Sequence, residues 1–392
     1  MIYPANFEEK IGFDRIREQV TALCSTPSAK AKLAEEGFST SADEIERRLS
    51  LMNEMRSLLM LERDFPDGDY PDPAPLVAKI RVEGSYLLAA EADQLRKALV
   101  TVGAIAEFIL GRGGARYPRL WELSRRVTLF PEIVRAIDAI LDDHGEVKDS
   151  ASPELQQVRR AIREREGQAA KRLQQVLQRA KQAGIVDADA VLSVRDGRPV
   201  IPVAAANKRK LQGFIHDESA TGRTFYVEPV EVVEINNELK ELEYAERREV
   251  VKVLSAFTES IRPDAEVIAD AGDYLSSVDM IRAKARWALA NDAGKPILST
   301  DDRLELRTAR HPLLQQTLRA QGREVVPLDL ALDRRKHILV ISGPNAGGKS
   351  VCLKTTGLMQ YLFQCGYPVP ASEVSELPVF RSIFIDIGDE QS

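Results

Sequence analysis

The sequence has little cysteine, little histidine and no long uncharged hydrophobic run. Three cysteines and four histidines occur in 392 residues, and neither type shows the paired spacing of a disulfide framework or a zinc site. A disulfide-held scaffold and a metal site built from protein ligands alone are therefore not expected. The longest apolar stretch, residues 98–110, is interrupted by Glu107 and is shorter than the ~20 residues that a membrane span needs. We predict a cytoplasmic protein without a membrane partner.

Positive charge is also in deficit. The chain has 54 Lys and Arg residues against 60 Asp and Glu residues, a net charge of −6. That balance excludes a broadly basic nucleic-acid coat, so any contact with a polyanion has to come from a local basic face. The composition, 44% hydrophobic and 29% charged, is typical of a folded globular protein. The length predicts roughly two or three domains.

Helical spacing of apolar residues dominates the first 293 residues. It predicts a helical core domain over residues 1–150, a lever helix within 151–190, and returning lever and connector helices over 231–293. In the first lever, apolar residues recur every seven positions and form a narrow seam for a partner helix. They are Leu155, Ile162, Ala169 and Val176. At 1.5 Å per residue, each lever of about 30 residues reaches ~45 Å.

Residues 191–230 change to short β-branched runs separated by turns at Asp196-Gly197 and Thr221-Gly222. This texture predicts a small antiparallel sheet, a β-rich clamp at the tip of the two levers. A boundary at Gly294-Lys295-Pro296 opens the last segment, residues 294–392.

A glycine-rich loop lies between an apolar run, residues 337–341, and a helical pattern, residues 351–362. We predict a buried strand before the loop and a helix after it, the context that a phosphate-binding P-loop requires. The loop consists of Gly343, Pro344, Asn345, Ala346, Gly347, Gly348, Lys349 and Ser350. Lys349 can reach the β- and γ-phosphates of ATP or ADP, and Ser350 can bind Mg²⁺. A strand-to-helix turn without a ligand is the alternative, and it requires all four fixed motif positions to match by chance.

Several segments resemble the MutS family. The loop Gly-Pro-Asn-x-Gly-Gly-Lys-Ser, the Arg310-His311-Pro312 element before it and residues 383–389 after it are similar to segments of MutS ATPases. Four further runs resemble the bacterial type-two MutS proteins: 196–203, 216–229, 236–239 and 387–392. The resemblance covers nearly the whole chain. Together with the patterns above, it implies a mainly α fold with a small antiparallel β clamp, followed in residues 294–392 by a partial α/β P-loop (ABC-type) ATPase domain.

The resemblance implies a homodimeric clamp whose grip on a nucleic acid is gated by ATP. The implied substrate is branched or duplex DNA, with suppression of homologous recombination, or the rRNA of collided ribosomes. Val325 and Val326 match the place where MutS relatives contact adenine, although two valines before Pro327 also fit a core strand. A non-catalytic helical dimerisation module with nucleotide as a structural ligand is the alternative function. A transporter-type ATPase subunit fits poorly, because the levers are heavily charged.

The sequence departs from mismatch-repair MutS proteins at both ends. Phe7-Glu8-Glu9 matches their Phe-x-Glu wedge without room for a recognition domain, so we interpret the match as coincidence. Asp386 lies 37 residues beyond Lys349 and lacks a following Glu, so we interpret it as structural and assign no catalytic residue. ATPase activity is therefore expected of a longer protein and not of these 392 residues. The KOW and nuclease modules of the family are also missing, so no nuclease activity is expected here.

Positive charge concentrates in the first lever and at one turn of the clamp. Residues 154–183 contain eight Lys and Arg against three Glu, an excess of 8 − 3 = 5. We predict phosphate contacts by Arg159 and Arg163 in the lever and by three clamp residues at a hairpin tip. The clamp residues are Lys208, Arg209 and Lys210. No aromatic residue is interleaved with these cations, so backbone contact is favoured over base stacking. A solvated helix face is the alternative.

Overall fold

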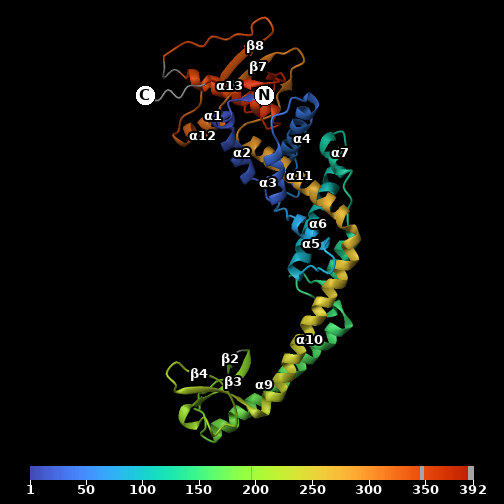
Figure 1. The fold of residues 1–392 in the computed structure, drawn as a ribbon, viewed down its shortest axis with the longest axis vertical. Helices are drawn as coiled ribbons and strands as arrows, with labels where there is room; N and C mark the ends of the chain where they lie inside the picture. Colours follow the sequence, from blue (N-terminus) through green and yellow to red (C-terminus); the bar gives the residue numbers. More distant parts are fainter. Residues whose placement is uncertain (196, 345–347, 387–392) are drawn as a thin grey trace. The chain divides into compact units, whose positions relative to one another are not determined.

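The computed structural model describes residues 1–195, 197–344 and 348–386, which fold into two compact units. Figure 1 shows the elements of both units in the order of the chain. The first unit consists of Met1–Arg81, Gln94–Val134 and the chain from Asp264 onward, and the second of Val82–Asp93 and Arg135–Pro263. Each unit collects segments that are distant in the sequence, whereas the predicted boundaries at 150, 190, 230 and 293 divide the chain in sequence order.

Helices form most of the first unit, as the apolar spacing predicted. They are α1 (Phe7–Ile11), α2 (Phe13–Ala22), α3 (Pro27–Glu35), α4 (Ala42–Leu61), α5 (Ala74–Ile80), most of α6 (Ala89–Gly111), α7 (Pro118–Ser124), α11 (Ala265–Ala290), α12 (Pro312–Ala320) and α13 (Lys349–Gln364). Side-chain capping sets the start of two of them, α3 and α4. The Thr26 hydroxyl accepts a hydrogen bond from the Ala29 amide at 3.0 Å and so begins α3, whose first residue, Pro27, has no amide hydrogen to satisfy.

Short strands complete the first unit. One sheet has four strands, in the spatial order β6 (Ile297–Leu298), β9 (Glu376–Leu377), β7 (Leu304–Ala309) and β8 (Leu328–Leu332). A second, two-stranded sheet pairs β1 (Ile2–Tyr3) in parallel with β10 (Ile383–Phe384). One hydrophobic core joins strands and helices. It buries Phe13 of α2, Trp287 of α11, Leu306 of β7 and Leu362 of α13. The beginning of the chain therefore packs in the same core as the helix that follows the glycine-rich loop.

The strand predicted before the glycine-rich loop is not formed. Residues 337–341 make no strand, and Ile338 and Val340 are 75% and 83% exposed. A strand of this apolar kind is stable when neighbouring strands and helices cover it. Among the described residues, β8 pairs with β7 and β10 pairs with β1, and neither strand pairs with residues 337–341. The prediction was wrong because an apolar run identifies a strand-forming tendency but does not supply the partner strand.

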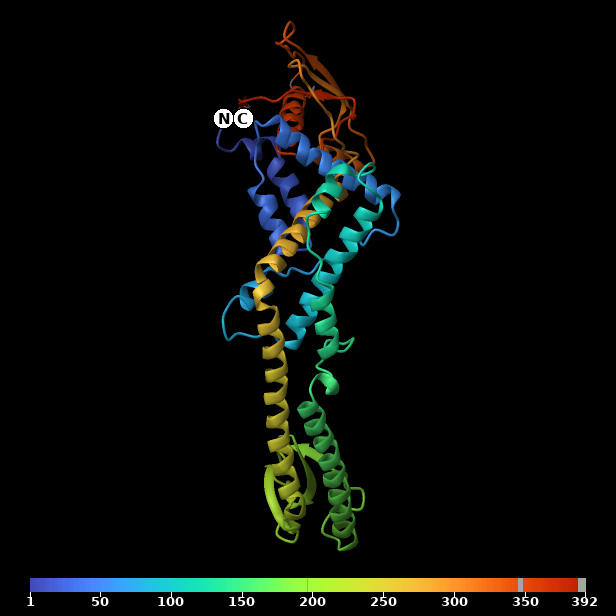
Figure 2. The same cartoon turned by 90° about the vertical axis from the view of Figure 1, so that its right-hand side faces the viewer.

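Two long helices of the second unit, α9 (Pro153–Gln182) and α10 (Val230–Ile261), run side by side (Figure 2). The Ser152 hydroxyl caps α9 by accepting from the Leu155 amide at 3.0 Å. The predicted seam is confirmed at three of its four positions, because Leu155, Ala169 and Val176 are buried, whereas Ile162 is half-buried. The unit also contains most of α8 (Pro131–Ile140) and the short 3₁₀ turns η1 (Asp149–Ala151) and η2 (Ala205–Asn207).

The predicted clamp sheet lies between α9 and α10 in the sequence. Its strands are β2 (Ser193–Arg195), β3 (Arg198–Ala204), β4 (Gly213–Glu218) and β5 (Thr224–Pro229). All pairs are antiparallel and the order is β2-β3-β5-β4, so β5 separates β3 from β4. Lys208, Arg209 and Lys210 consequently do not lie at a hairpin tip. That prediction was wrong because the pattern of apolar runs does not specify which strands pair.

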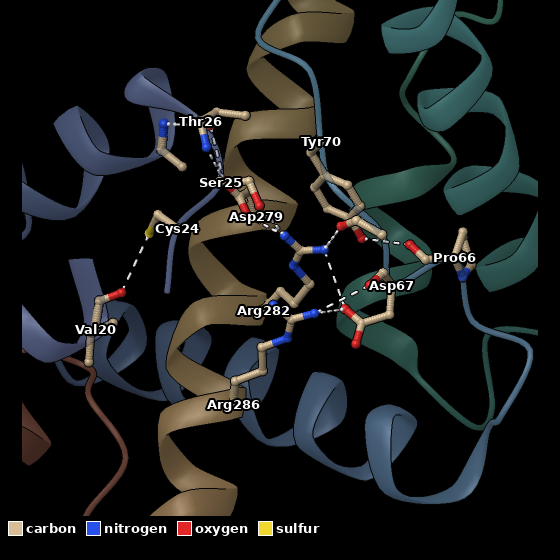
Figure 3. Close-up of polar contacts among 12 residues, drawn as sticks. Val20, Cys24, Ser25, Thr26, Pro66, Asp67, Tyr70, Asp279, Arg282 and Arg286 are labelled. Atoms are coloured by element: carbon tan, nitrogen blue, oxygen red, sulfur yellow. Dashed lines mark hydrogen bonds and ion pairs between the residues drawn. The ribbon is translucent and has the colours of Figure 1, made fainter. Parts of the chain in front are cut away.

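A fully buried guanidinium, Arg282 of α11, organises the centre of the first unit (Figure 3). It donates to Asp279 Oδ1 at 2.8 Å, to Ser25 Oγ at 2.7 Å and to the Gly68 carbonyl at 2.7 Å. The ring of Tyr70 lies 3.6 Å from the guanidinium carbon. These contacts hold the α2–α3 turn and the loop after α4 against α11.

Asp279, the buried partner of Arg282, extends the network to the start of α3. Its Oδ2 accepts from the Thr26 amide at 2.8 Å and from the Thr26 hydroxyl at 3.1 Å. Thr26 is the residue that caps α3. The two charges therefore compensate each other and also fix backbone groups, which is what makes a buried ion pair tolerable.

None of the helices in the described part of the chain combines the length and the hydrophobicity that a membrane span requires.

We predict that Arg282→Ala lowers the free energy of unfolding by about 3–5 kcal/mol, because it leaves the Asp279 charge buried without its cation. Chemical denaturation followed by circular dichroism measures the change. Arg286→Ala is the matched control, since Arg286 reaches Asp67 from a partly exposed position and its loss should cost roughly 1 kcal/mol or less. Equal losses in the free energy of unfolding would show that the buried ion pair contributes no more to stability than the exposed one.

Candidate nucleotide and nucleic-acid sites

The glycine-rich loop leads directly into α13, whose first residue is Lys349. Gly348 precedes it with φ +85°, a left-handed conformation that glycine adopts without strain. The Lys349 ammonium donates to the Gly343 carbonyl at 2.7 Å, so the cation lies against the beginning of the loop. The first amides of a helix lack partners within it, and the helix N-terminus favours an anion. Asn345, Ala346 and Gly347 lie outside the described residues.

Of the other residues predicted for the nucleotide, Ser350 and Val326 are exposed and Val325 is half-buried. Ser350 is exposed in the first turn of α13. Val325 and Val326 lie between α12 and β8, and Val326 is 89% exposed. The core-strand alternative for the two valines is therefore excluded, because β8 begins only at Leu328. Contact between these valines and adenine stays a prediction.

The N-terminal segment anchors α13. The Tyr361 hydroxyl and the Arg17 guanidinium each donate to Glu8 Oε1 at 2.6 Å. The rings of Phe7 and Phe13 lie 5.1 and 4.9 Å from the Tyr361 ring, as aromatic pairs prefer. Phe7 is buried, so it belongs to the core and does not form an exposed wedge. This agrees with the interpretation of the Phe-x-Glu match as coincidence.

His311 of the Arg310-His311-Pro312 element lines a cavity of about 340 Å³ together with Arg15 and with Lys354 of α13. Burial lowers the pKa of His311 to about 4, against a hydrogen bond with the Ile11 backbone that favours the charged form. The imidazole is therefore neutral near pH 7. Family resemblance was the only signal for this element in the sequence, because burial of a single histidine has no local signature.

Lys208, Arg209 and Lys210 follow η2 in the connection from β3 to β4. The side-chain amide of Asn207 donates to the Ile185 carbonyl at 3.0 Å, which fixes this connection beside the end of α9. The three cations therefore directly follow a residue that is bound to the segment just after that helix. Chain folding, and not sequence proximity, creates this basic region.

Two aromatic rings accompany the cations of the clamp. The Lys208 ammonium lies 4.3 Å from the centroid of Phe225, and the Arg195 guanidinium lies 3.8 Å from that of Tyr226. The expectation that no aromatic residue accompanies the cations was wrong. Phe225 is 17 residues from Lys208 in the sequence, and only the pairing of β3 with β5 brings them together.

Arg159 and Arg163, the predicted lever contacts, are engaged within the second unit. Arg159 donates to Glu246 at 2.7 Å and to Asp149 at 2.8 Å, and Arg163 donates to Asp149 at 2.9 Å. Hydrogen bonds from both arginines lower the pKa of Asp149. The structure therefore gives both side chains a role in joining η1, α9 and α10, and contact with a nucleic acid stays a prediction for them.

A buried carboxylate, Glu228, holds the clamp sheet against the beginning of α10. It is 1% exposed, accepts from Arg198 at 2.9 and 3.0 Å and from Asn236 at 2.6 Å, and lies 2.5 Å from His216 Nε2. Burial raises the pKa of Glu228, but the hydrogen bonds from Asn236, His216 and Arg198 together outweigh it and lower the pKa below its usual value. Sequence reasoning assigned none of these four residues, because they come from four separate elements.

The described residues contain no group of three or more His, Cys, Asp or Glu side chains that could hold a metal ion. Binding of Mg²⁺ by Ser350, alongside the phosphates of a nucleotide, stays a prediction. Asp386 follows β10 and lines a cavity of about 300 Å³ with Leu330 of β8 and Leu353 of α13.

Cys365 is buried, and burial raises the pKa of its thiol to about 12, in agreement with a packing role.

The chain has relatives among known proteins, although no protein-family model matches it. It is 34% identical over 382 residues to "Endonuclease MutS2" of Bacillus velezensis, 35% identical over 393 residues to "Endonuclease MutS2" of Thermomicrobium roseum, and 34% identical over 382 residues to "Putative endonuclease MutS2" of Bacillus subtilis. Each match covers 97% of this chain and 48% of the relative, so the chain spans about half the length of the curated relatives it matches. Along almost its entire length, the chain thus matches the MutS2 family.

Proposed function

We propose that the chain binds ATP or ADP with Mg²⁺ at the glycine-rich loop. The observation that carries the proposal is the junction of the loop with α13, where Gly348 is left-handed and the Lys349 ammonium contacts the Gly343 carbonyl. A nucleotide phosphate would replace that carbonyl as the partner of the ammonium and would meet the first amides of the helix. Ser350 would supply an oxygen ligand to Mg²⁺.

We further propose that the whole protein is a nucleotide-gated nucleic-acid clamp that hydrolyses ATP and acts as a homodimer. The cations beside the end of α9, Lys208 to Lys210, are the proposed phosphate contacts, and Arg159 and Arg163 are secondary to them because Asp149 compensates both. Branched or duplex DNA and the rRNA of stalled ribosomes present the same phosphate chemistry. The relatives are named endonucleases, and the proposal for this chain concerns the grip on nucleic acid.

A non-catalytic helical module with nucleotide as a structural ligand is the second candidate. The exposure of residues 338–341 favours it, because the segment before the loop lacks the packing of a completed ATPase sheet. The two candidates differ in one consequence. A gated clamp changes its nucleic-acid affinity when nucleotide binds, whereas a structural module changes only its stability.

Lys349→Ala should abolish nucleotide binding or weaken it by roughly 10- to 150-fold, the equivalent of a charge-assisted hydrogen bond of about 1.5–3 kcal/mol. Calorimetry with a non-hydrolysable ATP analogue and Mg²⁺ measures this. Lys354→Ala, further along α13, removes the same charge from the same helix and should leave the affinity nearly unchanged. Wild-type affinity in the Lys349→Ala variant would remove the P-loop assignment.

Reversal of the three clamp cations, Lys208→Glu, Arg209→Glu and Lys210→Glu, should weaken nucleic-acid binding. Its dependence on salt should flatten by up to ~0.9 log units for each phosphate of duplex DNA that the variant no longer neutralises. Fluorescence anisotropy across a salt titration, from about 50 to about 200 mM, provides both quantities. An unchanged slope together with unchanged affinity would favour a merely solvated loop.

A further inference from the structure

The paired helices α9 and α10 carry opposite charge. α9 contains eight Lys and Arg against three Glu, an excess of 8 − 3 = 5, whereas α10 contains four Lys and Arg against eight Glu, a balance of 4 − 8 = −4. The two helices lie side by side (Figure 2). The pair is therefore a rod with one basic and one acidic side, and a polyanion approaching it meets attraction on the α9 side alone.

Ion pairs between the helices use only part of this charge. Arg159 binds Glu246 at 2.7 Å and Arg165 binds Glu238 at 2.9 Å, and both pairs belong to the half of α9 nearer its beginning. Beyond residue 170 the pattern changes. Over the part of the chain that the structure describes, no acidic side chain pairs with Lys171, Arg172, Arg179 or Lys181.

Arginines and glutamines form an ordered stripe along α9. Arg165, Arg172 and Arg179 are spaced by seven residues, and Gln168, Gln175 and Gln182 are interleaved at the same spacing. At 100° per residue these six positions occupy a band about 100° wide along one side of the helix. Arg172 and Arg179 are exposed, as are the three glutamines. Guanidinium and amide donors therefore alternate along one face over about 25 Å.

The stripe continues into the clamp cations. The Asn207 amide binds the Ile185 carbonyl just beyond the end of α9, and Lys208 to Lys210 follow it directly. Arg223 belongs to the same neighbourhood, because its carbonyl accepts from the Ala205 amide at 2.9 Å. Two exposed acids, Asp187 and Asp189, lie in the intervening loop and are outnumbered by these cations.

We propose that this face of α9 binds the phosphate backbone of a nucleic acid and extends the contact from the clamp along the lever. The proposal rests on the proposed nucleic-acid function and adds a surface to it. Arginine and glutamine both donate hydrogen bonds to phosphate oxygens, and the stripe itself contains no aromatic ring, so the contact is independent of base sequence. The acidic α10, whose Glu238 already pairs with Arg165, disfavours binding of a polyanion on its own side of the rod.

The test compares two double substitutions on the two helices. Arg172→Gln with Arg179→Gln neutralises the stripe and keeps helix-compatible side chains that already alternate there. Arg247→Gln with Arg248→Gln is the matched control, because it removes two exposed arginines from α10. Circular dichroism and thermal unfolding establish that both variants fold like the wild type.

Anisotropy with labelled duplex DNA and with a single strand of the same sequence measures affinity against salt concentration. The stripe variant should bind at least about tenfold more weakly at low salt, and its salt slope on the duplex should fall by up to ~1.8 log units, whereas the control should match the wild type. Equal binding by wild type and stripe variant would overturn the proposal and leave the clamp function standing. Equal weakening in both variants would also overturn it, because net charge alone would explain the effect.

Two further outcomes contradict the proposal in distinguishable ways. A wild-type protein that binds neither probe at low salt would remove the nucleic-acid function itself and the stripe with it. The second outcome is self-association of the wild type that is sensitive to salt in sedimentation. If the stripe variant loses this self-association but keeps its nucleic-acid affinity, the basic face binds the acidic α10 of a second copy.

Discussion

The buried pair of Arg282 and Asp279 is the constraint on which the first unit depends. Charges are costly to bury, so the guanidinium has to be satisfied by several groups at once. Those groups come from the α2–α3 turn, from the loop after α4 and from α11 itself. Because Asp279 also binds the residue that caps α3, a shift of α11 would disturb the beginning of a second helix. The chain continues from α10 through the short turn η3 (Arg262–Asp264) into α11, so the anchored helix directly follows the lever in the sequence.

A second buried carboxylate has a comparable role in the clamp. Glu228 joins β3 and β4 to the start of α10 through Arg198, His216 and Asn236. In both units, therefore, buried charged residues fix the beginning of a helix, α3 in the first unit and α10 in the second. The cations proposed to bind phosphate differ from these, because Arg172 and Arg179 are exposed and Lys349 is only half-buried at the start of α13.

Sequence periodicity predicted the elements well where a single local signal decides the outcome. The first lever helix and the β-branched runs of the clamp both appear in the structure within a few residues of their predicted bounds. The glycine-rich loop could be recognised for the same reason, since its fixed positions lie within eight consecutive residues, and nucleotide binding by this loop stays a prediction. The family resemblance, carried by equally local motifs, is confirmed by the MutS2 relatives.

Properties that depend on distant partners were not predictable. The strand expected at residues 337–341 is absent because a strand needs a neighbour, and the hairpin at Lys208 is absent because β5 inserts between β3 and β4. The same insertion places Phe225 beside Lys208. The cations of α9 divide in a similar way, because the positions of the α10 acids decide that Arg159 is paired and that Arg172 has no acidic partner among the described residues.

Coupling between nucleotide and nucleic acid is the central claim, and one measurement addresses it directly. The affinity for branched DNA, duplex DNA and ribosomes is determined with and without a non-hydrolysable ATP analogue, in the wild type and in Lys349→Ala. The account predicts that nucleotide changes the wild-type affinity for at least one of these ligands by about 5- to 150-fold, the usual range of coupling between two sites, and leaves the variant unaffected. Nucleotide that binds the wild type without altering any of the three affinities would contradict a gated clamp.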